Sequence, residues 1–455
     1  MYMKCKSCKN KLINKLKKDS KKNTEKSKRL ESNYPTVEEV NSNNGPFSKN
    51  VYAKGLLGYG WKLSIPNDRK LYYSINYNNL TDTSYDGYEF ITPINGLKED
   101  IINFFNDLSK IINIEFIESQ AETLNDLYNE ATLLISFSDD SKSDLDGSYG
   151  YAYLPLANQL NSPDLVGIVW INHGDNFKLE DWTPGSYNWI TIVHEVGHAL
   201  GLKHPHDSYS DYYPTFPEVS ENNPYTDLGK NKENMHPLTV MGYTDLESPY
   251  VPKNKNGSGW CKGFGTIDIY VLQLLYGKSD KNTGDTIYTI PTLNDDSIFW
   301  EAIWDTGGND TITGENHTDA LVIDLRSASI KNNKKFAGSK LTTSKNILNK
   351  SQTGNKFFGF TIAKSVKIEN AIGGNGNDKI LGNKSNNQIT SIAGNDLING
   401  FKGYDTVIIN DIFDNFIIRK KSNKLTVLKR RGKGGRRVKI KNCEKIIFTD
   451  REYII

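Results

Sequence analysis

The sequence has few cysteines and no long hydrophobic run. Only four of its 455 residues are cysteine: Cys5 and Cys8 form a C-x-x-C, whereas Cys261 and Cys443 stand alone. This number and spacing predict neither a disulfide framework nor a zinc site of four cysteines. No stretch is apolar over the length of a membrane span, and the N-terminal region lacks the hydrophobic segment of a secretory signal. We therefore expect no membrane span and no classical signal peptide.

Positive charge is concentrated at the N-terminus. The formal net charge is +2, yet the first thirty residues hold twelve Lys or Arg against two acidic residues, a net of +10 that leaves −8 for the rest. We expect residues 1–45 to form a basic, disordered tail in which Cys5 and Cys8 are reduced thiols. In the alternative, one of these thiolates blocks a metal site in a latent form. The length of the chain predicts two domains in addition to this tail.

Histidine is also rare, and four of the seven histidines lie in the stretch "HEVGHALGLKHPH". Positions i and i+4 share one face of an α-helix, so His194 and His198 point the same way. Gly201 lets the chain leave the helix through a left-handed conformation, after which His204 can return to the same point. Three imidazoles and an open position for water are typical of a catalytic zinc ion. Glu195, next to the pair without being an obligatory ligand, is placed to act as general base.

The alternative for this stretch is a helix that carries surface histidines. The gathering of four rare residues in thirteen positions disfavours it. His206 does not fit the ligand spacing and is expected to flank the site, while Pro205 restrains His204 to an extended backbone.

The string H-E-x-x-H-x-x-G-x-x-H is the signature of the metzincin peptidases, to be confirmed by a methionine turn downstream. "LTVMGYTD" supplies this turn with Met241, and Tyr243 follows two residues later. In these features the chain resembles the serralysin-type secreted zinc peptidases, one metzincin branch. The resemblance implies that Met241 lies under the three imidazoles and that Tyr243 is a displaceable zinc ligand that stabilises the transition state. The alternatives are that Met241 is an ordinary core methionine and that Tyr243 is one of 25 tyrosines without a role at the metal.

The order of the predicted elements favours an α/β (α+β) catalytic domain over residues 46–280, as in the metzincin fold. Alternating or continuous apolar residues predict strands at 70–77, 131–138 and 165–172. Apolar residues at helical spacing predict helices at 97–113, 186–202 and 267–277. The stretch "SYGYAYLP" at 148–155 is expected at the sheet edge that pairs with an extended peptide substrate.

Short strand-like runs alternate with Gly-Asn-Asp turns after about residue 280. The clearest stretch repeats every nine residues over 373–408: "GGNGNDKIL", "GNKSNNQIT", "SIAGNDLIN", "GFKGYDTVI". It matches the G-G-x-G-x-D-x-U-x calcium repeat of RTX proteins, in which the glycine-rich half is a turn and the x-U-x half a short parallel strand. We therefore predict that residues 281–455 form an all-β domain, a parallel β-roll or β-sandwich.

Turns two repeats apart should stack on the same side of this roll, where carbonyl and carboxylate oxygens suit calcium. One side is predicted to use Gly374, Gly376, Asp378, Gly394 and Asp396. The opposite side has Asn386 and Asn387 where an aspartate is expected, depends on Gly403 and Asp405, and should bind calcium more weakly.

Further candidate ligands lie upstream, in "WDTGGNDTI" and "VKIENAIGG". They are Asp305, Gly307, Gly308, Asp310 and Glu369. The serralysin resemblance implies that these residues also hold calcium. The alternative for all the repeats is a set of Asn-Gly turns that bind no metal.

Two stretches near the C-terminus carry their own predictions. "KLTVLKRRGKGGRRVKI" predicts two strands around a basic, glycine-rich tip, which is either a solvated hairpin loop or a grip on nucleic acid or an anionic surface. The final "REYII" resembles the C-terminal export signal of the serralysin family, which implies a type I secretion apparatus as partner.

Together these features predict a zinc-dependent endopeptidase that acts on proteins or peptides. We expect one catalytic Zn²⁺, several structural Ca²⁺, an extracellular location, a monomer, and no nucleic acid partner. The alternative is a calcium-dependent RTX adhesin or anion-binding protein with a dormant protease core.

Overall fold

The computed structural model describes residues 36–40, 46–75, 84–85, 88–89, 96–121, 130–138, 149–155, 166–172, 181–244, 250–252, 258–296, 298–332, 337–349, 356–422, 425–432 and 435–455. The chain divides into two compact units. Unit 1 takes residues up to Met235 with Thr239–Glu247 and Ile267–Ser279, and unit 2 takes His236–Leu238, Ser248–Thr266 and Asp280–Ile455. Unit 2 thus includes two segments upstream of residue 280. Residues 1–35 of the predicted basic tail, with its C-x-x-C, lie outside the described residues. Val37–Glu39 form a strand that pairs with Trp61–Leu63, so the prediction of a disordered segment up to residue 45 is wrong there.

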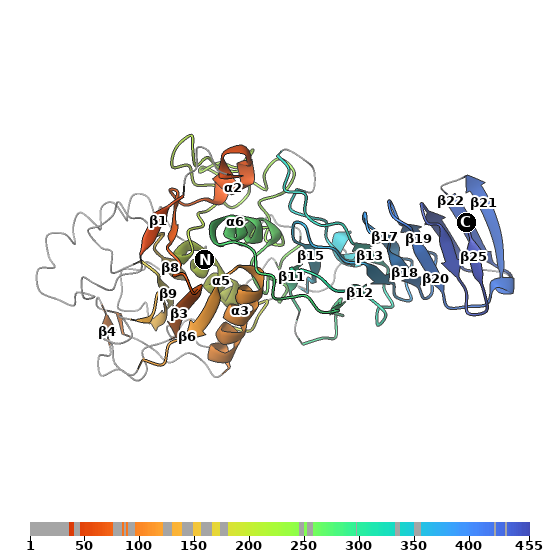
Figure 1. Ribbon diagram of the computed structural model, residues 1–455, viewed down its shortest axis with the longest axis horizontal. Coiled ribbons are helices and arrows are strands. Elements are labelled where there is room, and N and C mark those ends of the chain that lie inside the picture. The colour runs from red at the N-terminus through yellow and green to blue at the C-terminus, as the bar shows by residue number, and fades with distance from the viewer. Residues whose placement is uncertain are drawn as a thin grey trace, which may run out of the picture. The chain divides into compact units, whose positions relative to one another are not determined.

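Unit 1 contains a five-stranded sheet in the order β6-β3-β7-β9-β8 (Figure 1). The first four strands are parallel, and β8 pairs antiparallel with β9 at one edge. The strands are β3 (Lys70–Ile75), β6 (Glu115–Glu118), β7 (Leu133–Ser138), β8 (Gly150–Ala152) and β9 (Ile168–Asn172). The strands predicted at 70–77, 131–138 and 165–172 and the edge position of the 148–155 stretch are confirmed where the chain is described.

Over the described ranges, four helices accompany this sheet, and the last three of them follow the predicted apolar spacing. They are α2 (Val51–Leu56), α3 (Leu97–Ile111), α5 (Tyr187–Ala199) and α6 (Thr266–Tyr276). The hydroxyl of Ser186 accepts a hydrogen bond from the Trp189 N–H at 3.1 Å and caps the start of α5. Every residue of α5 is buried. Because buried polar groups need partners, the histidines and glutamate of this helix must be hydrogen-bonded or bind a ligand.

Short elements complete unit 1. They are η1 (Pro46–Lys49), the antiparallel pair β1 (Val37–Glu39) and β2 (Trp61–Leu63), and the antiparallel pair β4 (Ser84–Tyr85) and β5 (Tyr88–Glu89).

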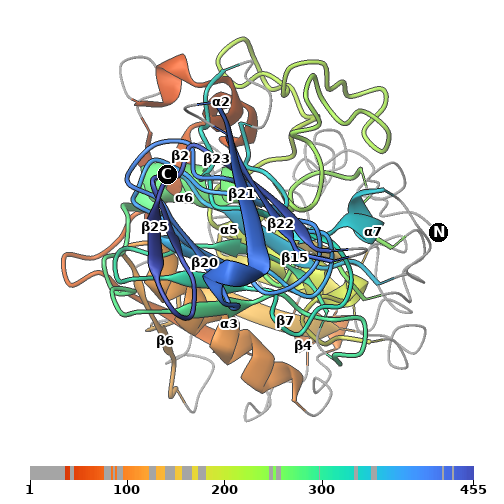
Figure 2. The ribbon, with the colours of Figure 1, turned by 90° about the vertical axis from the view of Figure 1, so that its right-hand side faces the viewer.

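Unit 2 is built mainly from two seven-stranded sheets, which Figure 2 views from the end that carries β21, β22 and β25. One sheet runs in the order β10-β12-β16-β18-β20-β24-β25 and the other in the order β14-β13-β17-β19-β23-β22-β21. The first comprises β10 (Ile287–Thr289), β12 (Thr311–Thr313), β16 (Asn370–Ile372), β18 (Gln388–Ser391), β20 (Thr406–Ile409), β24 (Lys445–Ile447) and β25 (Glu452–Ile454). The second comprises β13 (Leu321–Asp324), β14 (Thr343–Ser344), β17 (Lys379–Leu381), β19 (Leu397–Asn399), β21 (Phe416–Ser422), β22 (Leu425–Arg430) and β23 (Arg437–Lys441).

The nine-residue repeat produces this architecture, because successive repeats alternate between the two sheets. Strands two repeats apart pair in parallel, as Lys379 with Leu397 and Gln388 with Thr406. The central residue of each repeat strand points inward and is fully buried: Ile380, Ile389, Ile398 and Val407. The predicted parallel β-roll is therefore confirmed.

The glycine-rich halves of the repeats form the turns along the two edges of the roll. Gly394 has a φ of +79° and Gly403 a φ of +118°, values that L side chains rarely adopt. A Cβ on Gly394 would collide with the carbonyl of Gly376, and one on Gly403 with the carbonyl of Ser385. Successive turns can therefore stack directly on one another.

Smaller elements complete unit 2. They are the parallel pair β11 (Trp300–Ile303) and β15 (Gly359–Ile362), α7 (Lys345–Leu348) and η5 (Phe413–Asn415). The strands expected on either side of the basic tip are β22 and β23, which pair antiparallel. Cys261 and Cys443 are buried and are not joined in a disulfide. Within the described part of the chain, no helix is long and apolar enough to span a membrane.

Candidate active site and metal centres

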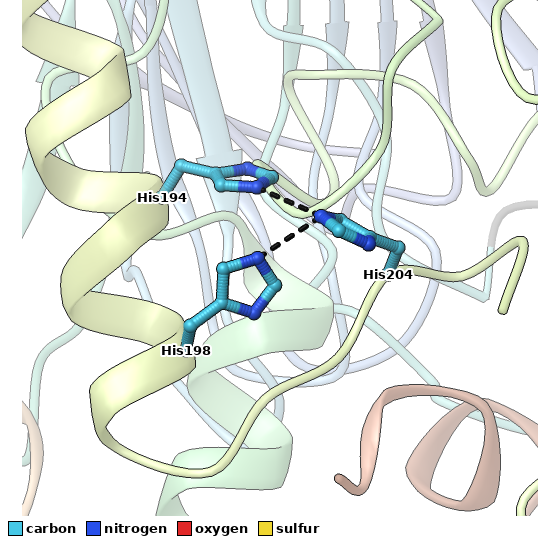
Figure 3. A group of neighbouring side chains, drawn as sticks. All are labelled: His194, His198 and His204. Atoms are coloured by element: carbon cyan, nitrogen blue, oxygen red, sulfur yellow. Dashed lines mark hydrogen bonds between the residues drawn. The ribbon is translucent and has the colours of Figure 1, made fainter. Parts of the chain in front are cut away.

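Three histidines converge in unit 1, as their spacing predicts. His194 and His198 project from α5, and His204 returns from the following loop to face both (Figure 3). Its Nε2 lies 3.1 Å from His194 Nε2 and 3.0 Å from His198 Nε2. Gly201, with a φ of +101°, makes the turn that brings the third ring back.

The other nitrogen of each helix histidine is already occupied. His194 Nδ1 lies 2.8 Å from the Val240 carbonyl, and His198 Nδ1 lies 2.7 Å from the Leu202 carbonyl. Carbonyl oxygens only accept hydrogen bonds, so these Nδ1 atoms carry the protons and the Nε2 lone pairs face the third ring. Ring nitrogens whose lone pairs converge in this way can bind a cation, and neutral imidazole nitrogens are typical ligands of zinc.

Burial keeps these rings neutral. It lowers the pKa of His194 to about 4 and, together with the neighbouring imidazoles, the pKa of His198 well below the usual value. The pKa of His204 is lowered in the same way, first by burial and then by His194 and Lys203. The ligand set is therefore available at neutral pH without a proton having to be displaced.

The loop that carries His204 is held by two residues that the sequence did not single out. Asp207 Oδ2 lies 2.8 Å from His204 Nδ1, which orients the ring. Lys203 is fully buried, and its Nζ donates to the carbonyls of Gly55 at 2.5 Å, Asp207 at 2.7 Å and Pro214 at 3.0 Å. The Lys203 side chain thus links α2 to two points of the loop, Asp207 and Pro214.

His206 lies beside this set, as expected for a flanking residue. Its ring stacks on that of His204, with centroids 4.8 Å apart and an interplanar angle of 5°.

The methionine turn lies beside the first histidine of the set. Met241 is fully buried, and the carbonyl of its neighbour Val240 holds His194. Asp268 on α6 accepts hydrogen bonds from the Thr239 hydroxyl at 2.6 Å and the Val240 N–H at 2.8 Å. A single aspartate thus fixes the turn that orients the first histidine, and nothing near it in the sequence signals this role.

Tyr243 and Glu195 complete the predicted set. The Tyr243 hydroxyl lies 2.8 Å from His204 Nε2, so this oxygen belongs to the same cluster of polar atoms. Glu195 is buried. It lies close to Gly150 of β8, since a Cβ atom added to that glycine would be only 2.9 Å from Glu195 Cγ. Strand β8, the sheet edge, therefore runs directly against the candidate general base.

In unit 2, Asp378 and Asp396 lie on one edge of the roll. Asp378 accepts from the Leu321 N–H at 2.8 Å and the Gly374 N–H at 2.7 Å. Asp396 accepts from the Asp378 N–H at 2.9 Å. Burial raises the pKa of Asp378 to about 6 and also raises that of Asp396.

The opposite edge carries Asn387, Asp405 and a residue that the sequence analysis missed, Glu444. Asp405 Oδ1 accepts from the Asn387 N–H at 2.8 Å, and Glu444 accepts from the Asp405 N–H at 2.7 Å. Asp405 is fully buried, and its Oδ2 has no hydrogen-bond partner within the described structure. Burial, followed by the charge of Glu444, raises the pKa of Asp405 to about 6.

The upstream candidates form a comparable group. Asp310 accepts from the Thr286 N–H at 2.9 Å, and Glu369 accepts from the Asp310 N–H at 3.1 Å. Asp305 accepts from the hydroxyl of Tyr288 at 2.7 Å. Burial, then the neighbouring carboxylates, raises the pKa of Asp310 to about 6. Asp310 Oδ2 is buried and unpaired among the residues described.

Helix α5 with its three buried imidazoles, the methionine turn and the antiparallel edge strand are the features of the metzincin pattern. Sequence comparison agrees: residues 78–230 match the matrixin model of peptidase family M10, and residues 268–430 match the model of the M10 serralysin C-terminal domain. The chain therefore has the domain order of the serralysin-type metallopeptidases, and the predicted resemblance is confirmed.

Individual relatives agree with the domain matches. A serralysin of Photorhabdus luminescens is 30% identical over 289 residues, which are 60% of this chain and 49% of the relative. A serralysin of Proteus mirabilis is 31% identical over 292 residues, 60% of this chain and 51% of the relative. Metalloprotease AprA of Pseudomonas entomophila is 28% identical over 336 residues, 68% of this chain and 59% of the relative. The chain thus spans about half to three fifths of the length of these relatives.

Proposed function

We propose that this chain is a secreted zinc-dependent endopeptidase with a calcium-stabilised β-roll. The observation that carries the proposal is the convergence of three neutral, oriented imidazoles next to Glu195 and Tyr243. Peptidases with this set act on proteins or peptides, and the serralysin relatives support the same activity.

The residues around the imidazoles would divide the chemistry between them. A zinc ion held by His194, His198 and His204 would polarise the scissile carbonyl and lower the pKa of its bound water. Glu195 accepts a proton from the attacking water and delivers it to the leaving amine. The Tyr243 hydroxyl donates a hydrogen bond to the negative charge that develops on the carbonyl oxygen. Met241 forms the apolar floor under the rings.

Strand β8 is the proposed docking edge for substrate. It is the outermost strand of its sheet, and it runs against Glu195. An extended peptide that added to this edge through backbone hydrogen bonds would bring a scissile bond next to the general base.

The roll is proposed to bind calcium through Gly374, Gly376, Asp378, Gly394 and Asp396 on one edge and Gly403 and Asp405 on the other. Asp305, Gly307, Gly308, Asp310 and Glu369 form the upstream group. The buried, unpaired oxygens of Asp310 and Asp405 support this role, since a buried carboxylate oxygen requires a cation or a proton.

The proposed location is extracellular. The serralysin resemblance, which includes the "REYII" stretch, supports export by a type I apparatus, and we propose that the protein acts as a monomer. An RTX adhesin with a dormant core is the competing function, but the presence of both Glu195 and Tyr243 disfavours it.

Hydrolysis of casein by the purified chain tests the proposal. Activity should disappear when a zinc-selective chelator is added at constant calcium and should return when zinc is restored. Hydrolysis that is indifferent to the chelator contradicts a zinc peptidase. A folded, zinc-loaded protein that cleaves no protein substrate favours the adhesin.

A further inference from the structure

Each edge of the roll is a stack of turns, and we call one turn together with the strand that follows it a layer. On the edge that carries Asp378 and Asp396, the last layer departs from the calcium repeat. In the sheet, Lys379 pairs with Leu397, and Leu397 pairs with Lys439. The same order appears in the turns, where the Asn395 N–H donates to the Asn377 side chain at 2.6 Å and the Arg437 N–H donates to the Asn395 side chain at 2.7 Å. Three layers of this edge can therefore be compared position by position.

This register shows which residues replace the repeat at the last layer. Arg436 takes the position of Gly376 and Gly394 in the two preceding layers, and Val438 takes the position of Asp378 and Asp396. The last layer has therefore lost the carboxylate of the repeat and gained a cationic side chain.

The guanidinium group of Arg436 lies inside the preceding turn, residues 391–396. Its Nε donates to the Gly394 carbonyl at 3.1 Å, and its Nη1 donates to the Ile392 carbonyl at 2.9 Å. Its Nη2 donates to the Ser391 carbonyl at 2.8 Å, to the Ser391 hydroxyl and, at 3.4 Å, to Asp396 Oδ2. The side chain is only 12% exposed. Three carbonyls and a carboxylate thus surround one positive charge, and these are the oxygen ligands that calcium prefers.

The two faces of turn 391–396 make different contacts. The inner face packs on turn 373–378, where Gly394 approaches the Gly376 carbonyl and Asp396 Oδ1 accepts from the Asp378 N–H. The outer face, toward the last layer, is occupied by Arg436. Because the fork of a guanidinium group presents five N–H donors in fixed directions, it can satisfy several fixed carbonyls at once.

We propose that Arg436 is a tethered substitute for calcium on the outer face of turn 391–396. This edge of the roll is closed by a cation that belongs to the chain, so its last layer holds together without a metal ion. The opposite edge ends in Asp405 and Glu444, and no such cation is built into it among the described residues. The proposal concerns the roll and does not depend on peptide hydrolysis.

The same contacts bear on the basic hairpin. The sequence left open whether its tip is a solvated loop or an anion-binding surface. Arg436 is engaged in the turn, so it is not available to an external anion.

The first test compares Arg436→Ala with Arg437→Ala in the full chain. Arg437 is the matched control, because it is the next residue, its side chain is exposed, and its contact with Asn395 uses the backbone N–H. The readout is the thermal midpoint of the roll in calcium-free buffer and in millimolar calcium, with zinc present in both. Loss of the charge-assisted hydrogen bonds should lower the midpoint of the Arg436 variant by about 5 °C without calcium.

Calcium should raise the thermal midpoint of Arg436→Ala more than it raises that of the wild type, because the ion can bind the oxygen atoms that the arginine no longer occupies. The response of Arg437→Ala should equal that of the wild type. An Arg436 variant that is destabilised equally in both buffers, or not destabilised at all, overturns the proposal.

A second test restores the repeat with the double variant Arg436→Gly, Val438→Asp. Equilibrium dialysis of the full chain should then detect one more bound calcium ion than in the wild type. A double variant with the wild-type number of ions, or one that is unfolded even in millimolar calcium, contradicts the substitution of arginine for calcium. Neither test involves hydrolysis, so failure of the proposed peptidase activity would be seen separately.

Discussion

The two regions that we propose to bind metal ions handle charge in opposite ways. In unit 1 the ligands are neutral imidazoles, each oriented through a hydrogen bond at Nδ1, for example by the Val240 carbonyl. In unit 2 the candidate ligands are carboxylates, several of them buried, and Asp310 and Asp405 each keep an unpaired oxygen among the residues described. Neutral ligands can be buried before an ion arrives, whereas buried carboxylates remain costly until a cation or a proton joins them.

This difference has a consequence for the metal-free protein. Unit 1 should keep its fold when zinc is removed, because the imidazoles are held by backbone carbonyls and by Asp207. The roll should lose stability when calcium is removed, except where Arg436 already supplies a positive charge. The predictions below start with the largest expected effect.

Replacement of Glu195 by alanine should abolish hydrolysis and leave both units folded. It removes the proton acceptor and no zinc ligand, so activity should fall by roughly 10²–10⁴ while zinc content stays the same. Casein turnover, zinc analysis and calorimetry check this. A purified variant with activity within about tenfold of the wild type would refute the assigned role.

Tyr243→Phe should lower turnover by about 10² and change the Michaelis constant little. The hydroxyl is expected to act on charge that develops only in the transition state. Steady-state kinetics on a defined peptide provide the measurement. A raised Michaelis constant with unchanged turnover would mean that Tyr243 binds substrate in the ground state.

Removal of calcium should lower the unfolding temperature of the roll on the order of 10 °C and leave that of unit 1 nearly unchanged. Ions that bind only the folded state add to its stability by mass action. Calorimetry of the full chain, with zinc kept constant, checks this expectation. A roll whose transition does not respond to calcium would favour plain turns without metal.

The calcium-free roll should become more stable by a few °C as the pH falls from about 7 to about 5. The folded-state pKa values of Asp378 and Asp405 are raised to about 6. The folded state therefore binds protons more readily than the unfolded state, and the stability gained on protonation is lost as the pH rises through about 6. With calcium bound the trend should reverse, because protons compete with the ion. Thermal melts at several pH values, with and without calcium, distinguish the two slopes.

Local sequence was sufficient where function depends on short-range geometry. The spacing of His194, His198 and Gly201 places two imidazoles on one helical face and the turn after them, and the third imidazole follows. The nine-residue repeat similarly determined the parallel roll, since each repeat encodes one turn and one strand with a buried centre.

The sequence did not predict the residues that hold these parts from a distance. Asp268 reaches the methionine turn across 28 positions of the chain, Lys203 reaches Gly55 across 148, and Arg436 reaches Gly394 across 42. Lys203 lies inside the histidine stretch and Arg436 inside the basic stretch, but at neither position does the pattern specify the residue type, and Asp268 lies in no motif.

The sequence by itself therefore determined which residues could bind metal ions and which fold would carry them. The tertiary structure decided how those ligands are oriented and which cation completes each turn. The physical reason is that helical spacing and repeat register act over a few neighbouring residues, whereas a hydrogen bond to a buried carbonyl or carboxylate depends on which distant side chain the packed chain brings within about 3 Å.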